Sequence, residues 1–145
     1  MSLSQFRVAE LLEALGARTP APASGAAAAL TGALGAALVE LAARFAGDDD
    51  SATSAHALAG RLAELADEDG DAYASFMAEQ TDASRARTIA VLLQVADCAE
   101  RVAVIGAHVR AQLSSAVAAD AEAGEALARA AAGVARRLAE FNQAP

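Results

Sequence analysis

The sequence predicts an all-α protein, a five-helix bundle with a long buried small-residue central helix, in a single domain over residues 1–145. The central helix is predicted over residues 25–46, because nothing charged appears between Arg18 and Glu40. A helix without a polar face must be surrounded by protein or by lipid. The composition agrees, since 55% of the residues are hydrophobic but only 3% are aromatic. Much of the hydrophobic content that is not aromatic is Ala, the best helix former. The other helices are therefore expected to cover the central one.

The uncharged helix has two alternative interpretations, a membrane span and a core helix. A span needs about 20 predominantly apolar residues. This stretch is mostly Ala and Gly, is broken by Thr31 and Glu40, and is followed by Arg44 without an aromatic belt. We therefore predict a core helix that is almost wholly buried over residues 26–44. Four further helices cover such a helix poorly in so short a chain, so we also expect a homodimer or an assembly of dimers.

Start and stop signals place the five helices along the chain. The first is predicted over residues 2–15, and Pro20 and Pro22 then form an extended connector. Ser24 is expected to cap the second helix and Gly47 to end it. The remaining helices are predicted over residues 52–79, over residues 85–117 after a cap at Thr81 to Ser84, and over residues 121–141 with Asp120 as the N-cap.

Charge and cysteine content exclude several classes of partner. The net charge is −8 and the pI about 4.6, which argues against a nucleic acid or an anionic membrane surface as partner. All eleven basic residues are Arg, so an anionic ligand must be met by Arg or by backbone N–H groups. Cys98 is the single cysteine. One cysteine excludes an internal disulfide and fits a cytoplasmic protein.

The third predicted helix contains four carboxylates in five residues, together with Gly70. Such a segment opposes helix formation by propensity and by charge, and local inconsistency of this kind is typical of functional sites. Most of these carboxylates are expected to face solvent. One must turn inward if Tyr73 and Phe76 do, and burial would raise its pKa.

The fourth predicted helix carries a narrow polar stripe that includes Arg87, Asp97 and Arg101. Its spacing fits either an exposed, salt-bridged face or a face toward a ligand cleft. No metal site is predicted, because the chain lacks a Glu-x-x-His pair. The acidic turn at residues 48–51 also lacks the spacing of a calcium loop.

Two short motifs carry a family resemblance. Pro20-Ala21-Pro22-Ala23-Ser24-Gly25-Ala26 opens the Ala-rich helix, and Asp69-Gly70-Asp71-Ala72-Tyr73 lies in the acidic one. They are similar to the Pro-x-Pro-Gly-Gly-Gly-Ser turn and the Asp-x-x-Ala-aromatic motif of the cyclodeaminase/cyclohydrolase family. This family comprises the helical domain of formiminotransferase-cyclodeaminase and stand-alone methenyl-tetrahydrofolate cyclohydrolase. The chain departs from the pattern by Ala23 and Ser24 in place of two glycines. It also lacks the Pro-Lys pair that the family has after the acidic helix, and it contains no lysine at all.

The resemblance implies an enzyme of folate one-carbon metabolism, either deaminating formimino-tetrahydrofolate or hydrolysing the methenyl bridge. A tetrahydrofolate derivative would be the substrate, with no further cofactor. The implied catalytic proton-transfer group is Asp69, with Asp67 and Glu68 facing solvent. The implied substrate-binding residues are Pro22, Ser24, Gly25 and Tyr73. Arg87 or Arg101 is expected on the glutamate tail of the folate only from residue type, because Arg binds carboxylates with two hydrogen bonds. The alternative is a non-catalytic helical dimer that keeps the scaffold as a ligand- or protein-binding module.

Overall fold

The computed structural model describes residues 1–144, and within this range the fold is all-α, with no strand. A short 3-10 helix, η1 (Leu3–Gln5), precedes five α-helices. Their bounds are α1 (Val8–Gly16), α2 (Ser24–Ala46), α3 (Asp49–Glu79), α4 (Asp82–Arg110) and α5 (Val117–Gln143). The all-helical prediction and the number of helices are confirmed.

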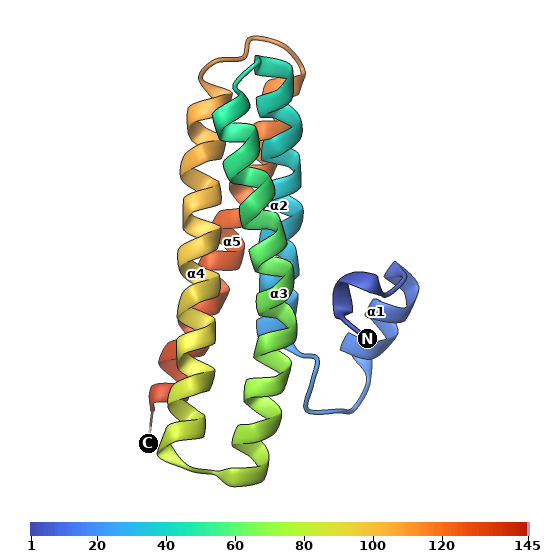
Figure 1. Cartoon of the computed structure of the whole chain (residues 1–145), viewed down its shortest axis with the longest axis vertical. Helices are drawn as coiled ribbons and strands as arrows, with labels where there is room; N and C mark the ends of the chain where they lie inside the picture. The colour runs from blue at the N-terminus through green and yellow to red at the C-terminus, as the bar shows by residue number, and fades with distance from the viewer. Residues whose placement is uncertain (145) are drawn as a thin grey trace.

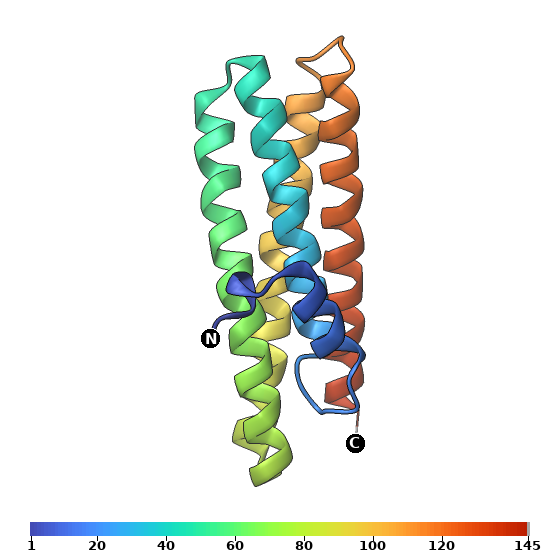
Figure 2. The same cartoon turned by 90° about the vertical axis from the view of Figure 1, so that its right-hand side faces the viewer.

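The four long helices, α2 to α5, run alternately up and down and form the bundle itself (Figure 1). α1 lies beside this bundle and has no buried residue. The view turned by 90° shows α1 lying across the lower part of α2 (Figure 2). The N-terminal segment is tied to α3 at Asp67, whose carboxylate accepts hydrogen bonds from the Leu3 backbone N–H (2.9 Å) and the Ser2 hydroxyl (2.6 Å). The expectation that Asp67 faces solvent is therefore wrong.

Small residues allow α2 to approach its neighbours closely. A Cβ atom on Gly35 would lie 2.8 Å from the Gly124 carbonyl oxygen of α5, and one on Gly124 would lie 2.7 Å from the Gly35 carbonyl oxygen. A Cβ on Gly32 would lie 3.2 Å from the Leu62 side chain of α3. Real Cβ atoms essentially never lie within 3.0 Å of such a neighbouring atom, so neither Gly35 nor Gly124 has room for a side chain. The crossing of α2 and α5 therefore depends on two facing glycines.

α2 is only partly buried in the single chain, so the expectation of nearly complete burial over residues 26–44 is not met there. Leu34, Leu41 and Phe45 are 64%, 41% and 68% exposed, and they lie along one side of the helix at spacings of seven and four residues. α2 is also long and apolar enough to span a membrane, although half of its apolar window is buried inside the bundle. A core helix of a soluble protein has the same properties.

The helix ends agree with the predictions in part. Gly47 ends α2 with φ +70°, a conformation that favours glycine, and the Thr81 and Ser84 side chains cap the start of α4 reciprocally. Ser24 is the first helical residue of α2 instead of its cap. Other boundaries differ as well: the predicted helix over residues 2–15 is divided into η1 and α1, and α3 begins at Asp49 rather than 52. α4 ends at Arg110 rather than 117, and α5 already begins at Val117, so Asp120 lies inside its first turn.

The unequal helix lengths leave room for a pocket. At a rise of about 1.5 Å per residue, α2 spans about 35 Å, whereas α3 spans about 46 Å. Because α2 and α3 meet at the same upper end, the hairpin of α3 and α4 projects below the first turn of α2 (Figure 1). The end of α5 and the connector before α2 adjoin this lower region.

We expect Gly124→Ala to destabilise the protein by about 1–3 kcal/mol, because its Cβ would meet the backbone of Gly35. Gly133→Ala is the matched control in the same helix. A Cβ there has no neighbour within 4 Å, so this substitution should stabilise the protein by about 0.5–1 kcal/mol. Urea unfolding of the three proteins checks the pair. Equal effects of the two substitutions would contradict the close approach of α2 and α5.

Candidate active site

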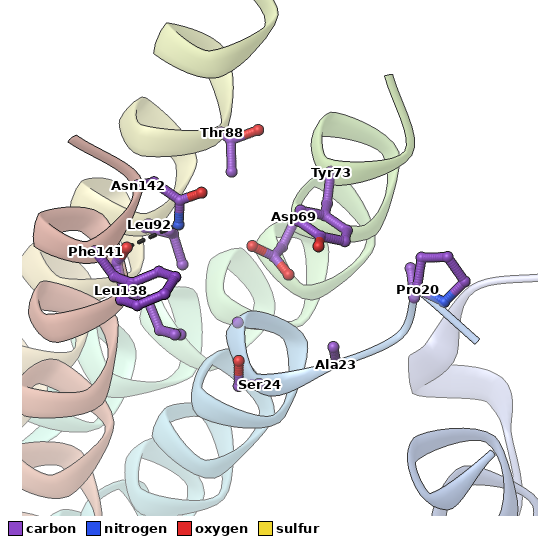
Figure 3. A pocket seen from close by; sticks show the side chains of 12 residues that line it. Pro20, Ala23, Ser24, Asp69, Tyr73, Thr88, Leu92, Leu138, Phe141 and Asn142 are labelled. Atoms are coloured by element: carbon purple, nitrogen blue, oxygen red, sulfur yellow. Dashed lines mark hydrogen bonds between the residues drawn. The ribbon is translucent and has the colours of Figure 1, made fainter. Parts of the chain in front are cut away.

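A pocket of about 240 Å³ lies where α2 begins and α5 ends. The connector and the first turn of α2 contribute Pro20, Ala21, Ala23, Ser24 and Gly25 to its wall. The long helices contribute the remaining lining residues: Asp69 and Tyr73 from α3, Thr88 and Leu92 from α4, and Leu138, Phe141 and Asn142 from α5. Figure 3 shows the α3 side chains on one side of this space and the α5 side chains on the other.

Asp69 is the one carboxyl group among the described residues that line the pocket. Its side chain is only 7% exposed, and this burial raises its pKa above the ordinary value. A hydrogen bond from the backbone N–H of Ala26, in the first turn of α2, acts in the opposite direction but is the weaker influence. No Arg, Lys or His is among the described residues that line the pocket. Asp69 therefore has no cationic side chain beside it to hold it ionised.

The Asp69 carboxyl group lies directly against the α2 backbone at Gly25. A Cβ atom on Gly25 would be 2.2 Å from Asp69 Oδ1 and 2.4 Å from its Cγ. Only glycine leaves room for the carboxyl group at this point. Ala23 and Ser24, which replace glycines of the resembling motif, need no such freedom, because Ala23 has a φ of −139° and neither residue has a positive φ. The glycine that the chain retains is the one that touches the acid.

The structure brings four of the predicted site residues together, namely Ser24, Gly25, Asp69 and Tyr73. Pro22 instead lines a neighbouring hollow next to Asp67 and the N-terminal residues. Arg87 is exposed and does not line the pocket, and Arg101 lies in a shallow hollow of α4 with Asp97 and Glu100. Within one chain, neither arginine reaches the site for which it was predicted.

The α5 residues of the pocket were missed by the sequence analysis. The predicted last helix, over residues 121–141, was given no role in the site, whereas Leu138, Phe141 and Asn142 all line the wall opposite Asp69. Asn142 Nδ2 donates a 2.8 Å hydrogen bond to the Leu138 carbonyl oxygen, which holds the amide in place. An aromatic residue at the end of an otherwise Ala-rich helix was the one available signal.

This arrangement suits proton transfer. A carboxyl group with a raised pKa exchanges a proton more readily near neutral pH than an ordinary aspartate does. The first-turn N–H groups of α2 and the hydroxyl groups of Ser24 and Tyr73 add hydrogen-bonding groups around it. The described residues contain no group of three His, Cys, Asp or Glu side chains placed to hold a metal ion.

We expect the stability contribution of Asp69 to be complete below pH 3.8, its ordinary pKa, and to be lost as the pH rises through its raised folded-state pKa. Above that range the folded protein must hold a buried carboxylate, whereas the unfolded chain ionises freely. Each tenfold difference in proton affinity between the two states is worth about 1.4 kcal/mol.

Asp69→Asn removes this titration. The stability of the variant relative to the wild type should therefore increase with rising pH, as measured by urea unfolding from acid to neutral solution. Asp71→Asn is the control, because Asp71 is exposed and should leave the pH dependence of the wild type unchanged. Parallel pH profiles for the wild type and Asp69→Asn would show that burial does not raise the pKa of Asp69.

Comparisons with known proteins identify the family of the chain. No curated protein matches the sequence significantly. The sequence profile of the family described as Formiminotransferase-cyclodeaminase matches residues 7–144, and this range contains α1 to α5 and every residue of the pocket. Because the match extends over nearly the whole length, the chain belongs to the formiminotransferase-cyclodeaminase family.

Proposed function

We propose that the chain is an enzyme of folate one-carbon metabolism that acts on the one-carbon bridge of a tetrahydrofolate derivative at Asp69. The observation that carries the proposal is the buried carboxyl group of Asp69 against Gly25. Family membership supports a folate-related substrate. A cytoplasmic location belongs to the same proposal and is supported by Cys98, which is free and buried.

Asp69 is proposed to move one proton during deamination. When N10 of the protonated formimino-tetrahydrofolate attacks the formimino carbon, the Asp69 carboxylate takes the proton that N10 loses. It then returns this proton to the departing amino group. The C–N bond to this group breaks, ammonia leaves, and the methenyl bridge between N5 and N10 remains. Because burial raises its pKa, the Asp69 carboxylate is a stronger base than an ordinary aspartate, which favours the proton uptake.

The same residue serves hydrolysis of the methenyl bridge. The Asp69 carboxylate takes a proton from the water that attacks the bridging carbon, and it returns this proton to N5 when the C–N5 bond breaks. The second proton of the water goes to solvent, and a formyl group remains on N10. Both reactions need one acid–base group next to the carbon, which is what the pocket provides.

The size and charge of the pocket suggest how the substrate lies. Its volume of about 240 Å³ is below the roughly 300–1,000 Å³ of typical ligand sites, so it holds part of a folate molecule. A glutamate carboxylate would find no cationic side chain among the described lining residues. The ring and the bridge are therefore proposed to lie inside, with the glutamate tail outside.

Asp69→Asn should abolish deamination of formimino-tetrahydrofolate or hydrolysis of the methenyl bridge, lowering kcat at least about 100-fold, as loss of a general acid–base group does. Folate binding should be retained, because the amide has nearly the same shape. Asp71→Asn, an exposed carboxylate two residues away, should keep wild-type activity. The absorbance of the methenyl bridge and the release of ammonia measure the two reactions.

Equal activity of the wild type and Asp69→Asn would overturn the role of Asp69. A wild type that binds folate without turnover would support the alternative, a non-catalytic helical dimer. The chain has no lysine, whereas the family has a Pro-Lys pair after the acidic helix. This difference bears on activity more than on the fold, and so it favours the non-catalytic alternative.

The proposal includes a homodimer in which the exposed stripe of α2 packs against a second copy. Leu34, Leu41 and Phe45 form this stripe, and no charged residue precedes Glu40 in α2. Arg44, which is exposed between Leu41 and Phe45, is paired with Glu40 of the same helix. The stripe therefore adds little net charge to a contact between two copies that each carry a net charge of −8. Exposed apolar side chains that gather along one surface are typical of a protein interface.

We expect the wild type to sediment as a dimer or a larger assembly and Leu34→Asp to shift it toward monomer. The matched control is Val104→Asp, because Val104 on α4 is also 64% exposed but lies outside the stripe. Sedimentation equilibrium at micromolar concentration measures both variants, and circular dichroism confirms that they remain helical. A monomeric wild type would rule out this interface.

A further inference from the structure

Aromatic side chains are rare in this chain, yet two of them line one pocket. The chain has four Phe and one Tyr, and the pocket wall contains Tyr73 from α3 and Phe141 from α5. Figure 3 shows these two side chains on opposite sides of the space. Phe141 is 81% exposed, so packing of α5 within the bundle does not account for an aromatic residue at this position. A ligand in the pocket would cover its ring.

Asn142 adds a fixed polar group to the same wall. Its Nδ2 donates to the Leu138 carbonyl oxygen at 2.8 Å, and this bond leaves Oδ1 as the acceptor available to a ligand. In Figure 3 the Asn142 side chain extends toward the space that separates α5 from Asp69. The last turn of α5 also carries the negative end of the helix dipole. This wall therefore offers acceptors, which suit N–H donors and repel a carboxylate.

We propose that the last turn of α5 is the ring-binding wall of the site. Phe141 stacks on the flat face of the folate ring system, and Asn142 Oδ1 accepts a hydrogen bond from an N–H group at the edge of that ring. The identity of the ring rests on the proposed function. The two contacts themselves follow from the pocket, because a planar heterocycle with N–H donors complements an exposed aromatic ring and a fixed acceptor.

The wall also orients the substrate. A ring held between α5 and Asp69 places its attached one-carbon bridge beside the carboxyl group, and it directs the glutamate tail away from the acceptors of α5. Phe141 and Asn142 are thus binding residues that determine which part of the substrate enters, while Asp69 carries the proton.

The test compares Phe141→Ala and Asn142→Ala with Gln143→Ala, which changes an exposed residue of the same turn that does not line the pocket. Calorimetry measures the Kd for monoglutamyl tetrahydrofolate and for a tetrahydropterin without the glutamate tail. Phe141→Ala should weaken the binding of both compounds about tenfold, as loss of a ring-stacking contact does. Asn142→Ala should weaken both by a similar factor. Phe141→Tyr keeps a ring and should bind normally.

Steady-state kinetics provides a second measurement, in which both alanine variants should raise KM and change kcat little, since Asp69 is intact. If the wild type binds folate and both alanine variants bind it with the same Kd, the ring-binding wall is wrong and the proposed function stands. If the wild type binds neither compound, both proposals fail. If Phe141→Ala leaves the Kd unchanged but sediments as a smaller species than the wild type, Phe141 belongs to a protein interface and the wall is also wrong.

Discussion

The contact between the Asp69 carboxyl group and the α2 backbone at Gly25 is the constraint on which the rest of the site depends. Any side chain at residue 25 would overlap the carboxyl group, since its Cβ would lie 2.2 Å from Oδ1. The contact keeps Asp69 buried, and burial raises its pKa. It also places the acid at the start of a helix, where the backbone N–H of Ala26 donates to it and the N–H groups of the first turn have no partner within the helix. One glycine thus links the geometry of the bundle to the protonation of its candidate acid.

The tight approach of the helices has a consequence for the site. α2 meets α5 through Gly35 and Gly124, whose backbones are too close for a side chain between them. This crossing directs the two helices so that the first turn of α2 and the last turn of α5 lie on either side of one pocket. A loosened crossing would therefore separate the walls as well as weaken the core. Stability and the shape of the site depend here on the same small residues.

The departures from the family motif concern positions that differ in physical importance. Ala23 and Ser24 replace glycines, but the backbone at both positions has no positive φ, and the close contact with Asp69 is made by Gly25 alone. The turn thus keeps its contact with the acid despite the loss of two glycines. The missing lysine is different, because none of the described residues that line the pocket carries a positive charge in its place. Inside the single chain the pocket is therefore complementary to neutral or cationic parts of a ligand.

The sequence by itself determined the helical class and the uncharged central helix, which are local features because periodicity and capping act over a few residues. The pairing of the Gly25 turn with Asp69 and Tyr73 was implied by the family resemblance of two short motifs and not by a local pattern. Only the tertiary structure decided the rest. Asp67 holds the N-terminal segment instead of facing solvent, Arg87 and Arg101 lie away from the pocket, and Phe141 and Asn142 line its opposite wall. Each of these placements depends on which helix faces which, and that is set by packing between residues far apart in the chain, which local sequence patterns do not encode.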